Sequence, residues 1–242
     1  MLARVDVELP IDIRRQPDDT TCGPTCLHAV YSYYGEDLTL ERVIEETRSL
    51  EAGGTLAVWL ACHALRRGYM STIYSYNLQV FDPSWFTGQD VDIAQKLREQ
   101  ADAKDDAKLR YATEGYLEFL QLGGKLRYID LTPNLIRGIL RRKLPILTGL
   151  SSTYLYQSKR VYGPKDTSDD IRGNPCGHFV VLAGYHRQHR TVLVADPYLQ
   201  NPLQDHFYAV NIDRVICSIL LGVLTHDANL LVIHPRRQTT PR

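Results

Sequence analysis

The spacing of apolar residues changes near residue 125, and this change limits the folds that the chain can adopt. Before residue 125, most apolar residues recur every three or four positions, as on the buried face of a helix. After residue 125, most segments alternate or run continuously apolar, as strands do. Helices first and strands later predict an α+β fold, in which a helical half packs on an antiparallel sheet. A cleft between two such halves is a natural place for a site.

Capping and turn residues divide this pattern into elements. We expect helices over residues 22–35, 40–47, 56–67, 132–141 and 212–221, with a further helical region over 90–122. We expect strands over residues 5–9, 70–76, 126–129, 144–150, 178–185, 191–195 and 230–233. Together they predict one domain over residues 1–242, with a helical insertion around 75–125 and a loop excursion over 151–174.

Length, composition and net charge limit the classes of protein to which the chain can belong. The chain has 242 residues, 44% of them hydrophobic, which is enough for one large domain with a buried core. Basic and acidic residues number 28 each, so net charge gives no general attraction to nucleic acid or anionic membranes. No apolar run approaches the about 18 residues of a membrane span, and the charged N-terminus lacks a signal-peptide core. We therefore expect a cytoplasmic protein without nucleic-acid or membrane partners, whose oligomeric state stays unknown.

The five cysteines are scattered and odd in number, which favours reduced thiols over a disulfide framework. Cys26, Cys62 and Cys217 lie in apolar patterns, where core packing is expected. Cys22 differs, because it follows a polar loop and opens a predicted helix. The unpaired N–H groups and the positive dipole end of a helix start stabilise a thiolate there.

Thiol catalysis needs a nucleophile, a base, a group that orients the base, and a donor for the oxyanion. The sequence offers Cys22 as nucleophile and His178, at the start of a strand, as base. Asp196 ends the next strand, where it can accept the Nδ1–H of His178. Gln16, upstream of the nucleophile, can donate to an oxyanion together with the Cys22 backbone N–H.

Three sequence blocks resemble the motifs of one enzyme family. Residues 16–27 (QPDDTTCGPTCL) resemble the nucleophile motif of the C39 cysteine peptidases, which are papain-like. Residues 177–185 (GHFVVLAGY) resemble the histidine strand of that family, and residues 194–197 (VADP) resemble its Asp-Pro motif. The blocks occur in the order that the family has.

The resemblance implies a papain-like fold and a Cys-His-Asp triad of Cys22, His178 and Asp196, with Gln16 as the oxyanion donor. It implies a cysteine peptidase that cleaves a peptide or isopeptide-type amide, with a peptide or protein as partner and without a metal or organic cofactor. The same triad could instead serve an acyl or peptidyl transferase or another peptide-modifying enzyme. A non-catalytic peptide-binding module on the same fold is a further alternative.

Two questions concern residues around this constellation. A zinc site of Cys22, Cys26, Cys176 and His178 is conceivable, although the spacing matches common structural zinc sites poorly. The 75–125 insertion and the 151–174 excursion are candidates for a lid or a specificity wall. Tyrosines in the excursion either line a peptide groove or pack within the loop; they are Tyr154, Tyr156 and Tyr162.

Overall fold

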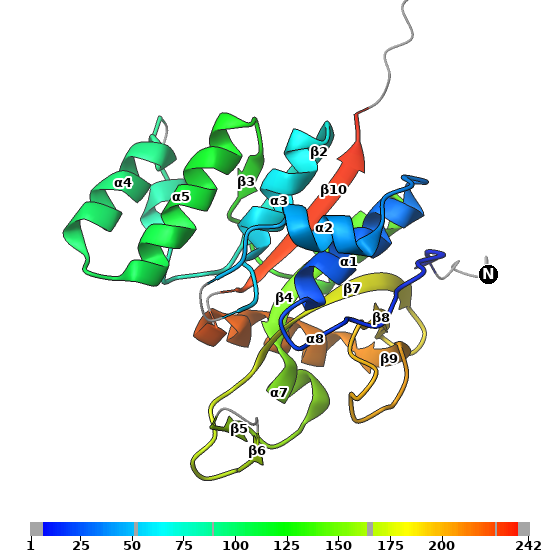
Figure 1. Cartoon of the computed structure of the whole chain (residues 1–242). Coiled ribbons are helices and arrows are strands. Elements are labelled where there is room, and N and C mark those ends of the chain that lie inside the picture. The colour runs from blue at the N-terminus through cyan, green and yellow to red at the C-terminus, as the bar shows by residue number, and fades with distance from the viewer. Residues whose placement is uncertain (1–6, 51–52, 89, 164–166, 226, 237–242) are drawn as a thin grey trace, which may run out of the picture.

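The computed structural model describes residues 7–50, 53–88, 90–163, 167–225 and 227–236, and in them one long sheet carries helices packed against it (Figure 1). The strand order is β3 (Lys125–Arg127), β2 (Tyr69–Ser75), β10 (Asn229–Pro235), β4 (Ile146–Ser151), β7 (Gly177–His186), β8 (Thr191–Ala195) and β9 (Phe207–Asn211), with β1 (Val7–Glu8) paired to β7. Every pairing is antiparallel except that of β2 with β3. This architecture confirms the predicted α+β class. The predicted strand over 5–9 begins outside the described residues.

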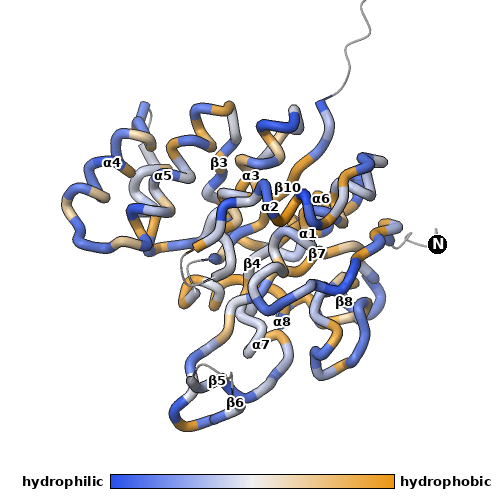
Figure 2. Tube along the Cα trace, in the orientation of Figure 1, coloured by the Kyte–Doolittle hydropathy of each residue, from blue (hydrophilic) through white to orange (hydrophobic). Residues whose placement is uncertain are grey.

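The central helices pack against the middle of the sheet. Helix α1 (Cys22–Tyr33) lies on β4 and β7, and α3 (Ala57–Arg66) lies on β2 and β10. Helix α8 (Ile212–Leu221) packs on β4, β8 and β9. Hydrophobic residues gather in the central strands and these helices (Figure 2). Their burial supplies the main favourable free energy of folding.

Local capping sets the ends of the helices. The Thr39 side chain accepts the N–H of the third residue of α2 (Leu40–Glu46), and Thr132 does the same for α6 (Pro133–Arg141). After α1 and α3, Gly35 and Gly68 adopt φ angles of 78° and 86°, which L side chains rarely adopt. The predicted limits of these four helices are confirmed to within two residues.

The 75–125 insertion forms a short 3-10 helix η1 (Pro83–Phe86) and two α-helices, α4 (Ile93–Ala103) and α5 (Ala107–Gln121). Helix α5 packs on α3, and a Cβ on Gly115 would come within 2.6 Å of the Val58 side chain. The two helices approach that closely because this position carries no side chain. In Figure 1 the insertion forms the left edge of the molecule, beyond α3. Among the described residues, no helix has the length and apolarity that crossing a membrane requires.

In the second half of the chain one prediction is wrong and one strand was missed. The 151–174 excursion is not a plain loop, because it contains helix α7 (Ser152–Tyr156) and a small hairpin of β5 (Val161–Tyr162) and β6 (Thr167–Ser168). Turn formers that surround such short elements hide them from a periodicity argument. Strand β9 was not predicted. A last 3-10 helix, η2 (Gly222–Thr225), follows α8.

Candidate active site

Cys22 is the first residue of α1 and is 8% exposed. Asp18 shapes the loop before it, since its Oδ1 accepts the N–H and the hydroxyl of Thr20 at 2.8 and 2.7 Å. The backbone N–H of Gln16 donates to the carbonyl oxygen of Pro197 at 2.9 Å. The loop that carries the thiol is therefore tied to the segment that follows β8.

His178 lies at the start of β7, Asp196 lies just past the end of the neighbouring strand β8, and their side chains face each other. His178 is the second residue of β7, and Asp196 directly follows β8. His178 Nε2 lies 2.8 Å from Asp196 Oδ1. The prediction that Nδ1 faces the carboxylate is wrong. Cys22 also acts on the ring, and because Nε2 faces Asp196, Nδ1 is the nitrogen that remains for the thiol.

The electrostatics of the pair favour an imidazolium beside a carboxylate. Burial lowers the pKa of His178, but the Asp196 carboxylate and the contact with Cys22 outweigh burial and raise it to about 10. Burial raises the pKa of Asp196, but His178 and two tyrosine hydroxyls hold it below its ordinary value.

The Asp196 carboxylate is 0% exposed, and each of its oxygens accepts two hydrogen bonds. Oδ1 accepts from His178 and from the backbone N–H of Tyr198 at 2.9 Å. Oδ2 accepts from the hydroxyls of Tyr156 at 2.7 Å and Tyr208 at 2.5 Å. The carboxylate is thus charged, dry and held in one orientation.

Sequence reasoning did not find the two hydroxyl donors. Tyr156 was considered only as a residue that lines a groove or packs within the loop, and Tyr208 was not singled out. Tyr208 lies opposite Val194 in the pairing of β9 with β8, which places it near the end of the strand that precedes Asp196. Predicting strand β9 from the sequence would have placed Tyr208 beside Asp196.

Gln16 is 6% exposed and lines the same cavity as His178. Its Nε2 donates to the carbonyl oxygen of Asp18 at 2.7 Å, which fixes the amide and leaves one N–H. Among the described residues, its Oε1 has no hydrogen-bond partner although it is buried. The remaining side-chain N–H of Gln16 can donate to a ligand in the cavity. The role of Gln16 as oxyanion donor stays a prediction.

A cavity of about 340 Å³ lies beside His178. It is lined by residues of the nucleophile loop, the excursion, the start of β7 and the segment after Asp196, namely Gln16, Asp19, Ser152, Thr153, Tyr156, Ser158, Lys159, Val161, Ser168, Cys176, Gly177, His178, Tyr198, Gln200 and Pro202. The excursion is therefore one wall of the cavity. No described residue of the 75–125 insertion lines it, so this cavity gives no support to the insertion as a lid or specificity wall.

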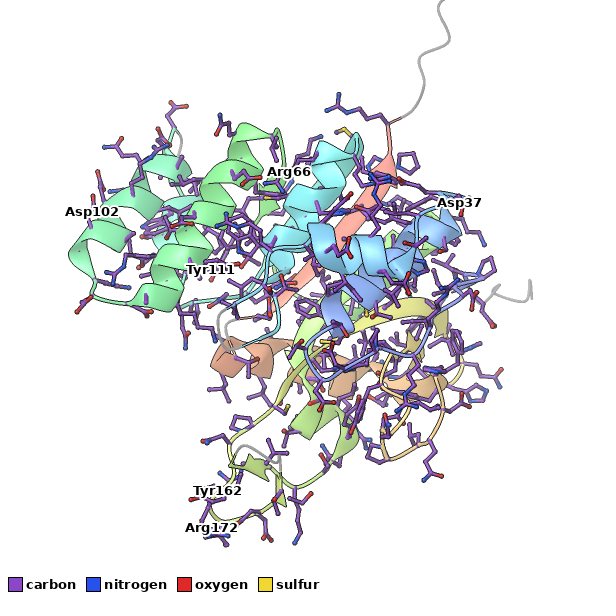
Figure 3. The ribbon with its side chains drawn as sticks, viewed as in Figure 1. Asp37, Arg66, Asp102, Tyr111, Tyr162 and Arg172 are labelled. Carbon is purple, nitrogen blue, oxygen red and sulfur yellow. The ribbon has the colours of Figure 1, made fainter. Side chains whose placement is uncertain are left out.

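Polar contacts hold the outer part of the excursion together. Arg172 bonds the Asp169 carboxylate at 2.7 Å, and its guanidinium lies 4.5 Å from the ring centre of Tyr162. Figure 3 shows Tyr162 and Arg172 at the tip of the projecting hairpin. Tyr162 and Tyr154 are partly exposed and, unlike Tyr156, do not line the cavity.

The other cysteines divide into buried and exposed. Cys26 and Cys62 are buried, as expected, whereas Cys217 is exposed and that expectation is wrong. The buried face of α8 carries Val215 and Ile219, and Cys217 lies off that face. Among the described residues, no group of three or more His, Cys, Asp or Glu side chains is placed to hold a metal ion. The zinc alternative has no support from this arrangement.

Comparison with known proteins gives a likeness of fold. No protein-family model matches the chain, and no curated protein matches it. A C39-like peptidase from Bacillus anthracis superposes with a TM-score of 0.50 at 13% identity, covering 96% of this chain and 99% of that one. The peptidase domain of Streptococcus ComA, a bifunctional ABC transporter, gives a TM-score of 0.44 at 13% identity, covering 93% and 99%. Xylellain, a cysteine protease from Xylella fastidiosa, gives 0.44 at 15% identity, covering 96% and 86%. The chain has the fold of a C39-like peptidase, as its sequence motifs implied.

Proposed function

We propose that this protein is a cysteine peptidase-like hydrolase that cleaves a peptide or isopeptide-type amide through Cys22, His178 and Asp196. The observation that carries the proposal is the hydrogen bond of the imidazole to a buried carboxylate, with the Cys22 thiol acting on the same ring. The fold of C39-like peptidases and the cavity beside His178 support it.

In the proposed reaction, the Cys22 thiolate attacks the substrate carbonyl carbon, and the C=O electron pair moves onto oxygen. The oxyanion accepts hydrogen bonds from the Cys22 N–H and from the remaining Gln16 N–H. The His178 imidazolium then gives its Nδ1 proton to the leaving amine as the C–N bond breaks. Asp196 keeps the ring in place and stabilises its charge.

The acyl-thioester that remains on Cys22 is cleaved by water. His178, now neutral, takes a proton from the water as its oxygen bonds to the acyl carbon. The second tetrahedral intermediate releases the Cys22 thiolate and the carboxylic acid product. Because this reaction cleaves an amide, we propose a peptide or protein as the substrate. A cytoplasmic location and a single domain over residues 1–242 stay predictions.

The test is cleavage of a complex peptide mixture, followed by mass spectrometry of new termini. We expect Cys22→Ala to lower the rate by about a thousandfold or more while the fold is retained. Cys217→Ala is the matched control, because this thiol is exposed on α8, and it should cleave like the unchanged protein.

Other outcomes would replace the proposal. Equal cleavage by Cys22→Ala would exclude Cys22 as the nucleophile. Peptide retention without new termini in any variant would indicate a binding module. Products joined to an added amine, in place of free acids, would indicate an acyl transferase.

A further inference from the structure

Two tyrosine hydroxyls donate to one oxygen of the buried Asp196 carboxylate. The Tyr156 and Tyr208 hydroxyls lie 2.7 and 2.5 Å from Oδ2. Burial, and after it the nearby Asp196 charge, raises the pKa of both phenols, so both remain protonated donors at ordinary pH. Because Asp196 is 0% exposed, water does not replace either donor directly.

The two donors come from different parts of the molecule. Tyr208 belongs to β9, within the main sheet, and is 8% exposed. Tyr156 is the last residue of α7, in the excursion, and its side chain lines the cavity. Its ring centre lies 6.3 Å from that of His178. One hydrogen bond to Oδ2 therefore depends on the sheet, and the other depends on the wall of the cavity.

We propose that Tyr156 is a positioning residue that couples occupation of the cavity to the His178–Asp196 pair. The inference rests on the proposed function, because the cavity is where the substrate polypeptide would lie. A group that enters the cavity presses on the α7 wall and changes the Tyr156 bond to Oδ2. The charge that Oδ1 presents to His178 changes with it, since hydrogen bonds to a carboxylate compete for its electron density. Tyr208 holds the same oxygen but does not line the cavity.

Cys176 allows the cavity to be filled without knowledge of the substrate. It is exposed and lines the cavity, whereas Cys26 and Cys62 are fully buried. In a Cys22→Ser, Cys217→Ser protein, N-ethylmaleimide should therefore modify Cys176 and place its ring in the cavity. The measured signal is the proton resonance of His178 Nε2–H, which lies in the hydrogen bond to Asp196. This signal needs no turnover.

The experiment compares three proteins on that background: Tyr156 and Tyr208 intact, Tyr156→Phe, and Tyr208→Phe. Before modification, both Phe variants should shift the resonance downfield, because a carboxylate with one donor fewer accepts more strongly from His178. After modification, the resonance should move in the intact protein and in Tyr208→Phe. It should stay in place in Tyr156→Phe. If Tyr208→Phe does not fold, the other two proteins still decide the question.

An equal response to maleimide in all three proteins, or no response in the intact protein, would overturn the coupling. Neither result would bear on the proposed hydrolase, which is tested by cleavage. Conversely, absence of cleavage would remove the proposed function and leave the resonance data intact. With a cleavable peptide, each Phe variant should lower kcat by about tenfold, as for the loss of one hydrogen bond to a charged group, but only Tyr156→Phe should also change KM.

Discussion

The 75–125 insertion and the outer part of the 151–174 excursion both lie outside the central sheet, but different forces hold them. The insertion buries Leu97, Tyr116 and Phe119 against α3 and its own helices, so apolar contact attaches it. In the excursion, Leu155 is buried at the base, but hydrogen bonds also hold the base, and the tip is held together by polar contacts such as that of Arg172 with Asp169. Apolar burial stabilises strongly and without direction, whereas polar contacts stabilise weakly and fix orientation.

The two segments also differ in what they reach. The excursion lines the cavity and touches the Asp196 carboxylate through Tyr156. The described part of the insertion does neither. Changes in the insertion should therefore alter the free energy of unfolding, and changes in the excursion should alter binding and chemistry.

The largest effect is expected from Phe119→Ala in α5. Phe119 is 0% exposed, so the change removes a buried aromatic ring and leaves a cavity. The free energy of unfolding should fall by about 3–5 kcal/mol in urea titrations. Glu114→Ala on the exposed face of the same helix is the control and should change little. The rate of peptide cleavage per folded molecule should be unchanged in both variants; a loss of rate in Phe119→Ala would show that the insertion acts on the site.

A smaller effect is expected from pH, because His178 and Asp196 make the free energy of unfolding depend on it. The pKa of His178 in the folded protein, about 10, lies above that of an unfolded histidine, about 6.5, so folding favours its protonated form. Its contribution is fully present below the unfolded pKa and is lost as pH rises through about 10. Asp196 has the opposite sign: its lowered pKa gives stability that is lost only in acid. As His178 loses its proton in alkali, the free energy of unfolding should fall by an amount of the order of a few kcal/mol.

Unfolding should be measured between about pH 8 and pH 10. Burial raises the pKa of Asp227 to about 7, so its titration lies mostly below this window. Phe119→Ala should show the same decline as the unchanged protein, offset by a constant amount. A stability that stays flat across the window, together with an NMR titration of His178 at an ordinary pKa, would contradict the assignment of a charged pair.

The sequence predicted the parts of the fold that depend on neighbouring residues. Thr39 and Thr132 cap helices through atoms three residues away, and Gly35 ends a helix through its own φ angle. Such signals are visible in a short window. The region 90–122 was predicted as helical, but the break between α4 and α5 and the Asp106 cap of α5 were not located.

The site was harder to predict, because its contacts join distant segments. His178 and Asp196 were named from motifs, but which imidazole nitrogen faces the carboxylate depends on where Cys22 lies in space. The Tyr208 donor depends on the register of β9 against β8, and Tyr156 depends on a five-residue helix inside a run of turn formers. Neither register nor a short helix leaves a periodic pattern in the sequence.

The smallest effect on stability is expected from removing one hydrogen bond in each of the two segments. At the base of the excursion, the Thr153 hydroxyl oxygen accepts the N–H of Cys176 at 2.9 Å. In the insertion, the Thr87 hydroxyl donates to the carbonyl of Ser84 at 3.0 Å. Thr153→Val and Thr87→Val each remove one such bond with nearly unchanged shape. Each should lower the free energy of unfolding by about 1 kcal/mol or less, as for a partly solvated neutral bond.

The two valine variants should differ in KM. Thr153 and Cys176 both line the cavity, so loss of their bond loosens that wall, and KM for a cleaved peptide should rise severalfold. Thr87 lines no part of the cavity, and its variant should keep the original KM. If both variants raise KM alike, the insertion influences binding from a distance and the division between the two segments is wrong. If neither does, polar anchoring of the excursion at Thr153 is not what shapes the cavity, and the contacts of Ser152 with the Cys176 carbonyl are the next to remove.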